Sequence, residues 1–271
     1  MTAVSTGLAP AALRQHARKV NPLGLLTGVV LLAVWQLLVA VKALNLKYLP
    51  TPWQIITSYG ELFTGTPFPG ALGHTVSVTL IGWAVASAAA IVVALLLGLS
   101  RIAWNWSMSS MELLRALPAI TMLPIAVVIF GLSSTMELVL VMYVSFWPVL
   151  IGTARGIRSV DPLLRDVGDT LRLGRLAVIR KIVLPAAAPL CVVGLRISLT
   201  LALVLAVVAE IVANPAGIGY QIAFEQQALR PDLMFACIFV VGLLGIVLNA
   251  LLVLAVRLTM PGVSRTLEDA A

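Results

Sequence analysis

Charged residues and cysteines are scarce in this chain, and each shortage excludes a class of protein. Only 11% of the 271 residues are charged, whereas 61% are hydrophobic and the mean hydropathy is +1.06. A soluble domain is usually about 25% charged and about 45–50% apolar. The two cysteines, Cys191 and Cys237, lie far apart in apolar runs, so they form neither a disulfide framework nor a metal-binding pair. The composition therefore predicts a membrane protein.

The sequence also lacks the short motifs of common enzymes. None of its four lysines follows a glycine, which excludes a Walker A phosphate loop. Neither His16 nor His74 is followed by glutamate, which excludes an H-E-x-x-H zinc helix, and no G-x-S-x-G nucleophile turn is present. We therefore expect no catalytic residue, no metal ligands and no cofactor bound by this chain itself.

Long apolar runs are abundant, and they predict an all-α membrane protein with about six transmembrane helices. A helix needs about 20 apolar residues to cross the hydrocarbon core. The predicted spans cover residues 23–41, 72–99, 111–130, 136–154, 190–212 and 233–256. Pro118 and Pro124 interrupt the third run, and prolines inside a span kink it.

The runs divide the chain into five parts. These are a tail (1–22), a first transmembrane segment (23–47), an outer-face loop (48–70), a transmembrane core (71–260) and a second tail (261–271). Within the outer-face loop, an amphipathic stretch from Pro52 to Phe63 predicts a short interfacial helix, because proline suits the first helical turn. Trp53 and Tyr59 would lie at headgroup depth.

Basic residues are distributed unevenly across the predicted spans. Of the 18 lysines and arginines, Lys42, Lys47 and Arg230 fall on one side, and Arg196 lies inside the fifth span, near its start. The others fall on the side that holds both termini. Lysine and arginine gather on the cytoplasmic side of membrane proteins. We therefore predict that both termini are cytoplasmic.

A polar segment from Arg155 to Pro185 separates the fourth and fifth runs and would also be cytoplasmic. Asp161 before Pro162 favours the start of a helix. Leu164, Val167 and Leu171 recur at helical spacing and form one apolar stripe. This stripe is flanked by Arg165, Asp169 and Arg172.

Gly174 is predicted to end this helix, and a second short helix is predicted from Arg175 to Val183, ending at Leu184–Pro185. A short amphipathic helix in the cytosol can dock into an apolar groove on a partner. It can equally be a connecting helix that rests on the membrane surface.

The segment resembles the EAA loop of the membrane permease subunits of ATP-binding-cassette importers. That signature reads E-A-A-x-x-x-G, followed nine residues on by I-x-L-P, which matches Ile182–Val183–Leu184–Pro185. Without gaps, the signature's glutamate falls on Asp166 and its alanines on Val167 and Gly168. Its glycine falls on Arg172, so Gly174 is expected to supply the break two residues later.

Further motifs resemble the nitrate, sulfonate and taurine branch of that family. Leu49–Pro50–Thr51–Pro52 is similar to its LPSP element. Gly194–Leu195–Arg196, Ala209–Glu210 and Gly217–Ile218–Gly219–Tyr220 are similar to its GLR…aE…GLGY run. The resemblance covers about residues 48–260.

The resemblance implies a type I importer permease in the bacterial cytoplasmic membrane. Such a permease pairs with a second copy, with two ATPase subunits that bind ATP and Mg²⁺, and with an external or lipid-anchored solute-binding protein. It would translocate a small anion, sulfonate or related organic acid, with no role for nucleic acid. The residues expected to contact the ATPase are Asp161, Leu164, Arg165, Asp166, Val167, Gly168, Asp169, Leu171, Arg172 and Gly174.

Polar residues inside the spans are candidates for the translocation path. Glu210 is interpreted either as part of an outer gate or as a glutamate whose carboxylate lies among the headgroups, and Glu137 is interpreted as interfacial. The other candidates are Thr75, Ser77, Thr79, Thr121, Ser145, Ser198, Thr200 and Asn249.

Two other functions are compatible with the composition. An ion-gradient-driven secondary transporter would need a pair of broken helices or an embedded carboxylate cluster, and neither is visible in the sequence. A structural membrane subunit would need no motif at all. Dependence on a cognate ATPase distinguishes both from an importer permease.

Overall fold

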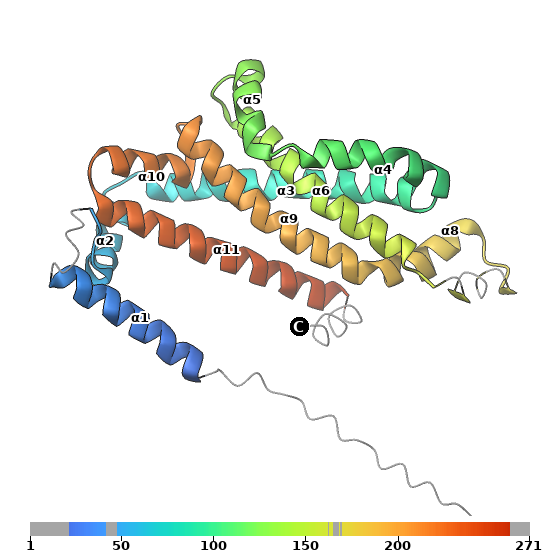
Figure 1. Cartoon of the computed structure of the whole chain (residues 1–271), viewed down its shortest axis with the longest axis horizontal. Coiled ribbons are helices and arrows are strands. Elements are labelled where there is room, and N and C mark those ends of the chain that lie inside the picture. Colours follow the sequence, from blue (N-terminus) through green and yellow to red (C-terminus); the bar gives the residue numbers. More distant parts are fainter. Residues whose placement is uncertain (1–21, 42–47, 162, 165–167, 169, 261–271) are drawn as a thin grey trace, which may run out of the picture. The chain divides into compact units, whose positions relative to one another are not determined.

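The computed structural model describes residues 22–41, 48–161, 163, 164, 168 and 170–260, and every regular element among them is a helix (Figure 1). This confirms the predicted all-α class. The chain forms two compact units, Met1–Trp53 and Gln54–Ala271. The predicted tails and the residues Pro162, Arg165, Asp166, Val167 and Asp169 lie outside the described residues.

The first unit contains α1 (Pro22–Ala40), which matches the first predicted span. Its 19 residues correspond to about 28 Å of helix, close to the hydrocarbon thickness. The backbone N–H of Trp53 donates to the Gln36 side-chain oxygen at 3.2 Å. The amphipathic helix expected after the first span is α2 (Pro52–Thr64), and from Gln54 on it belongs to the second unit.

Four helices of the second unit are long and apolar enough to cross a membrane. They are α3 (Phe68–Gly98), α6 (Ser134–Arg158), α9 (Leu184–Val212) and α11 (Pro231–Thr259). They confirm the second, fourth, fifth and sixth predicted spans. The third run, predicted over 111–130 and kinked by its prolines, is bent as predicted, but its helical part begins earlier, at Arg101.

That region forms α4 (Arg101–Ala116), a short 3₁₀ turn η1 (Ala119–Met122) and α5 (Leu123–Phe130), and the two helical parts are bent by 78°. The bend has a local cause, because Pro118 disfavours helical backbone at Leu117, which is extended at ψ 118°. The bent pair is a fifth candidate span or a re-entrant loop.

The fifth span begins earlier than the sequence indicates. α8 (Arg175–Val178) runs into a π-helical turn, η2 (Ile179–Val183), and on into α9, giving one apolar helix from Arg175 to Val212. The prediction of a separate second helix that ends at Leu184–Pro185 is therefore wrong. A π turn changes the hydrogen-bond register just before Pro185, which lacks an N–H, so the helix continues through it.

Helices α6 and α9 pack backbone to backbone. A Cβ on Gly194 of α9 would lie 2.7 Å from the Pro148 carbonyl oxygen of α6. A Cβ on Gly152 or Gly156 would lie 2.8 Å from the Leu190 carbonyl oxygen or 2.7 Å from the Ala187 carbonyl oxygen. Small residues permit this close approach of helices in membranes.

We expect Gly194→Ala to destabilise the protein by about 1–3 kcal/mol, because the added methyl group must push α6 and α9 apart. The matched control is Gly242→Ala on α11, where a Cβ would meet nothing within 4 Å. Unfolding of the purified protein in detergent measures both. Equal stability of the two variants would contradict the tight packing.

The second unit has two distinct ends (Figure 1). α10 (Gly217–Gln227) contacts α3, α9 and α11 at one end, which we call the α10 end. The connection between α6 and α8 lies at the other, which we call the loop end. At the α10 end the Glu61 carboxylate of α2 lies 2.7 Å from the Arg230 guanidinium, and this hydrogen bond raises the pKa of Arg230.

Candidate functional site

The loop end presents several apolar side chains outward. Leu163, Leu164, Leu171 and Leu176 are all exposed. The backbone is helical at Leu163 and Leu164, as predicted, and the Asp161 carboxylate accepts a hydrogen bond from the Leu163 N–H at 2.9 Å. Asp161 therefore caps this helix. Exposed leucines beside charged residues give the loop end the composition of a protein contact.

The helix ends at Arg172. This residue has φ +50°, a left-handed conformation, and the Leu173 N–H donates to the Gly168 carbonyl at 3.0 Å. Such a bond across five residues, with a left-handed residue inside it, is the Schellman helix end, where glycine is usual. The alignment placed the signature's glycine at this residue. Gly174 has φ −63° and begins α8, so the expectation that it supplies the break is wrong.

The buried Gly168 explains why the signature requires a small residue there. A Cβ at this position would lie 3.1 Å from Val178 Cγ2 and 3.2 Å from Ile182 Cδ1. The loop helix therefore packs closely on α8 and η2. The remaining predicted contact residues, Arg165, Asp166, Val167 and Asp169, lie outside the described residues.

Replacing Arg172 with glycine is expected to stabilise the loop by about 1 kcal/mol, because a left-handed conformation strains every residue that carries a Cβ. Hydrogen exchange of the loop amides is the measurement. Gly174→Ala is the control and is expected to be tolerated, since its φ is ordinary and a Cβ there meets nothing within 4 Å. A loop loosened by Arg172→Gly or by Gly174→Ala would contradict this helix end.

The α10 end contains a buried polar cluster, formed by His74, Thr75, Glu137, Glu210 and Asn214. Glu210 Oε1 accepts from the Thr75 hydroxyl at 2.7 Å, and Oε2 accepts from the Gly219 N–H at 2.8 Å. Thr75 in turn accepts from the Ile218 N–H at 2.9 Å. These bonds satisfy two amides in the first turn of α10, where the helix dipole favours a negative charge.

The second carboxylate belongs to the same cluster. Glu137 Oε2 accepts from the Asn214 amide at 2.6 Å and lies 3.0 Å from His74 Nε2. Both glutamates are fully buried. The interpretation of Glu137 as interfacial, and the alternative that Glu210 lies among headgroups, are therefore wrong. Each carboxylate is inside the protein because donors from other helices solvate it.

Ligand atoms of His74, Glu137 and Glu210 all lie within 4.8 Å of one another, a grouping that could hold a metal ion. From the sequence we expected no metal ligands, and neither His74 nor Asn214 was a candidate site residue. His74 and Asn214 contact Glu137 across sequence separations of 63 and 77 residues, so no local pattern connects them. The one sequence feature that could have indicated this cluster is His74, a histidine near the end of an apolar run.

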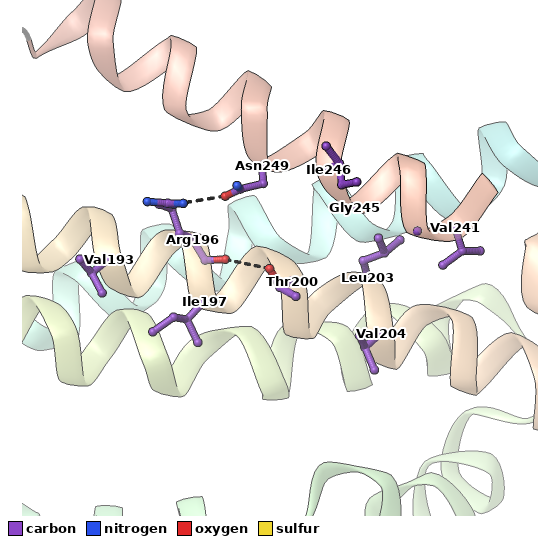
Figure 2. Close-up of a pocket in the computed structure, with 11 residues that line it drawn as sticks. Val193, Arg196, Ile197, Thr200, Leu203, Val204, Val241, Gly245, Ile246 and Asn249 are labelled. Carbon is purple, nitrogen blue, oxygen red and sulfur yellow. Dashed lines mark hydrogen bonds between the residues drawn. The ribbon is translucent and has the colours of Figure 1, made fainter. Parts of the chain in front are cut away.

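A cavity of about 630 Å³ lies between α9 and α11 (Figure 2). Its polar lining consists of Arg196 and Thr200 on α9 and Asn249 on α11, and the remaining lining residues are aliphatic or glycine. Arg196 Nε donates to Asn249 Oδ1 at 3.2 Å. Thr200 donates its hydroxyl to the Arg196 carbonyl at 3.2 Å.

A second cavity of about 510 Å³ adjoins the first, because Val193 and Ile197 line both. It lies among α4, α6 and α9 and contains the side chains of Arg115 and Arg155. No Asp or Glu is among the described residues that line these two cavities. A third space of about 40 Å³ lies next to Arg115 and Arg155 and includes Glu112.

The hydroxyls predicted for the pathway occupy different environments. Ser77 and Thr121 are exposed, and each donates to a carbonyl of its own segment. Thr79 and Ser145 are fully buried, and among the described residues their hydroxyls have no hydrogen-bond partner. Of the predicted pathway residues, Thr200 and Asn249 line a described cavity, and Thr75 and Glu210 belong to the buried polar cluster. Ser198 is buried and accepts a hydrogen bond from the Trp83 indole N–H at 2.8 Å.

Comparison with known proteins connects this geometry to transport. The family model for the binding-protein-dependent transport system inner membrane component matches residues 86–265, more than half of the chain. The match includes the loop end, both large cavities and most of the buried polar cluster.

Two curated relatives extend the similarity over most of the chain. The "Putative aliphatic sulfonates transport permease protein SsuC" of Bacillus subtilis is 29% identical over 222 residues, which cover 82% of this chain and 80% of the relative. The nitrate import permease protein NrtB of Leptolyngbya laminosa is 27% identical over 229 residues, with 82% and 81% covered.

Solved structures support the fold. An amino acid ABC transporter crystallised with histidines matches with a TM-score of 0.58 at 17% identity, over 78% of this chain and 98% of that one. The inward-facing MetNI methionine ABC transporter matches with a TM-score of 0.53 at 15% identity, over 67% and 94%. These likenesses confirm the predicted type I importer permease fold.

Proposed function

This chain belongs to the family of binding-protein-dependent transport system inner membrane components, the permease subunits of ABC importers, and from that premise we propose that it imports a small anion while a separate ATPase is docked at its loop end. The observation that carries the docking proposal is the loop itself. Its leucines are exposed, and its helix ends with a left-handed residue, Arg172, at the position where the family signature has glycine.

The charge distribution supports a cytoplasmic position for the loop end. Arg155 and Arg158 end α6, and Arg257 lies in the last turn of α11. Arg175, Arg180 and Lys181 follow on α8 and η2. At the α10 end, Arg230 is paired with Glu61. By the positive-inside rule the loop end faces the cytosol, and both termini do so as well.

The continuous helix from Arg175 to Val212 gives the docking proposal a mechanical consequence. Movement of an ATPase at the loop would pass directly into the span that lines both cavities. In this mechanism ATP and Mg²⁺ are bound and used by the partner, and this chain contributes only contacts that differ between two states. A second copy of the permease and an external solute-binding protein complete the importer.

The positive charge of the two cavities favours an anionic solute. Three arginines line them, and no Asp or Glu is among their described lining residues. Glu112 shares the small adjoining space with Arg115 and Arg155, but not with Arg196. Curated relatives are named for sulfonate and nitrate transport. A small anion such as nitrate or an alkyl sulfonate therefore fits both the charge of the cavities and the names of the relatives.

Reconstitution with purified components tests this function. We expect proteoliposomes that contain the permease, its ATPase and its binding protein to accumulate radiolabelled taurine or ¹⁵N-nitrate only when ATP is enclosed with the ATPase. Omission of the ATPase or the binding protein should abolish accumulation. Accumulation driven by an ion gradient without the ATPase would instead establish a secondary transporter.

A further inference from the structure

Arg196 lies about midway along a membrane-spanning helix. It is 12 residues after Leu184 and 16 before Val212, the two ends of α9. These separations correspond to about 18 Å and about 24 Å of helix. Asn249, its partner, is also remote from both ends of α11. Both side chains therefore lie at a depth where the bilayer is hydrocarbon.

A charged guanidinium at this depth requires a polar environment. Arginine at the centre of a transmembrane helix costs about 2.5–3.5 kcal/mol on insertion scales, so such residues face a protein interior or a water-filled cavity. Arg196 is exposed in this chain and faces the cavity of about 630 Å³. Of these two environments, a cavity is the one that the structure gives Arg196.

The guanidinium is oriented but not neutralised. Its Nε donates to the Asn249 side chain at 3.2 Å, which fixes the plane of the group (Figure 2). Among the described residues, its two terminal nitrogens have no hydrogen-bond or ion-pair partner, and Asn249 carries no charge. Asn249 therefore positions the arginine without satisfying its charge.

A planar, unneutralised guanidinium is suited to a small oxyanion. Two parallel N–H groups can bind two oxygens of a nitrate, sulfonate or carboxylate group at once. The aliphatic remainder of the lining, which includes Val193, Ile197 and Ile246, suits a short organic chain attached to that group.

We infer that Arg196, oriented by Asn249 in the cavity between α9 and α11, is the point at which this chain binds the anionic group of its solute midway across the membrane. The inference rests on the proposed function, and it adds the residues and the chemical group that they recognise. Arg115 and Arg155 in the adjoining cavity continue the positive charge toward the loop end.

Cysteine labelling at Thr200 tests this inference without measuring transport. Thr200 lies one turn from Arg196 in the same cavity. In a complex with Cys191→Ser and Cys237→Ser, which remove both native thiols, Thr200→Cys provides the reporter. Its rates of reaction are compared for an anionic sulfonatoethyl and a cationic trimethylammonioethyl methanethiosulfonate.

We expect the anionic reagent to react faster than the cationic one. Arg196→Gln should lower the ratio of the anionic to the cationic reaction rate about tenfold, which is the effect of one nearby charge in a hydrated cavity. Arg257→Gln is the matched control, because it removes the same charge from the last turn of α11, outside the cavities described above. That variant should leave the ratio unchanged.

Protection by solutes supplies the second measurement. Sodium nitrate or sodium methanesulfonate should slow the labelling at least threefold relative to sodium chloride of equal ionic strength, and Arg196→Gln should abolish this protection. A thiol that reacts with neither reagent, a ratio insensitive to Arg196→Gln, or no protection by either anion would each overturn the inference. Failure of ATP-driven uptake would overturn the proposed function instead.

Discussion

An importer carrying Leu171→Asp is expected to lose at least nine-tenths of its ATP-driven uptake. Leu171 is 65% exposed at the loop end, next to the helix terminus at Arg172. If an ATPase groove buries this leucine, an aspartate places an unpaired carboxylate in an apolar contact, and central contact residues of this kind contribute about 2 kcal/mol or more. Loss of the ATPase from the purified complex should accompany the loss of uptake.

The matched control for Leu171→Asp is Leu132→Asp. Leu132 is 64% exposed, in the turn between α5 and α6 at the α10 end. The same charge is introduced at the same exposure, but far from the loop. We expect the ATPase to co-purify with this variant in normal amount. Normal ATPase binding by Leu171→Asp, or equal losses in the two variants, would contradict docking at the loop.

Thr75→Val is expected to destabilise the protein by about 2–4 kcal/mol, the second largest effect of a single substitution. The hydroxyl of Thr75 donates to Glu210 and accepts from the Ile218 N–H, and both partners are buried. Valine leaves these two groups without that partner, at a cost of about 1–3 kcal/mol each. Because the bonds hold the first turn of α10, the α10 end should loosen first in hydrogen exchange.

Thr79→Val on the same helix is the control for Thr75→Val. Both threonines are fully buried, but the Thr79 hydroxyl has no hydrogen-bond partner among the described residues. Replacing it should change the free energy of unfolding by less than about 0.5 kcal/mol, or should stabilise the protein. If the two variants prove equally stable, the hydrogen bonds of the buried polar cluster do not hold α10.

Hydropathy and local propensity accounted for most of the helices. The runs that became α3, α6, α9 and α11 were visible because a span must satisfy its backbone internally and present apolar side chains. Pro52 marked the start of α2, and Pro118 marked the break after α4. Local rules failed at Pro185, where a π turn that no local motif announces allows the helix to continue.

The buried polar cluster was not predictable from local sequence. His74, Glu137 and Asn214 belong to different elements, and each appears in isolation as a single polar residue near the end of an apolar run. Position along a helix says how deep a carboxylate lies but not which donors surround it. The helix end in the loop was easier to predict from sequence. The family signature has glycine at the position of Arg172, and the backbone there is left-handed.

The most direct measurement of the central claim is photo-crosslinking from position 171. A photoactivatable amino acid in place of Leu171, introduced into the full chain in native membranes, reports which molecule lies against the loop end. The account predicts one crosslinked protein, an ATP-binding-cassette ATPase, in membranes that are active in import. Crosslinks confined to lipid, or to a protein from the outer side of the membrane, would contradict it.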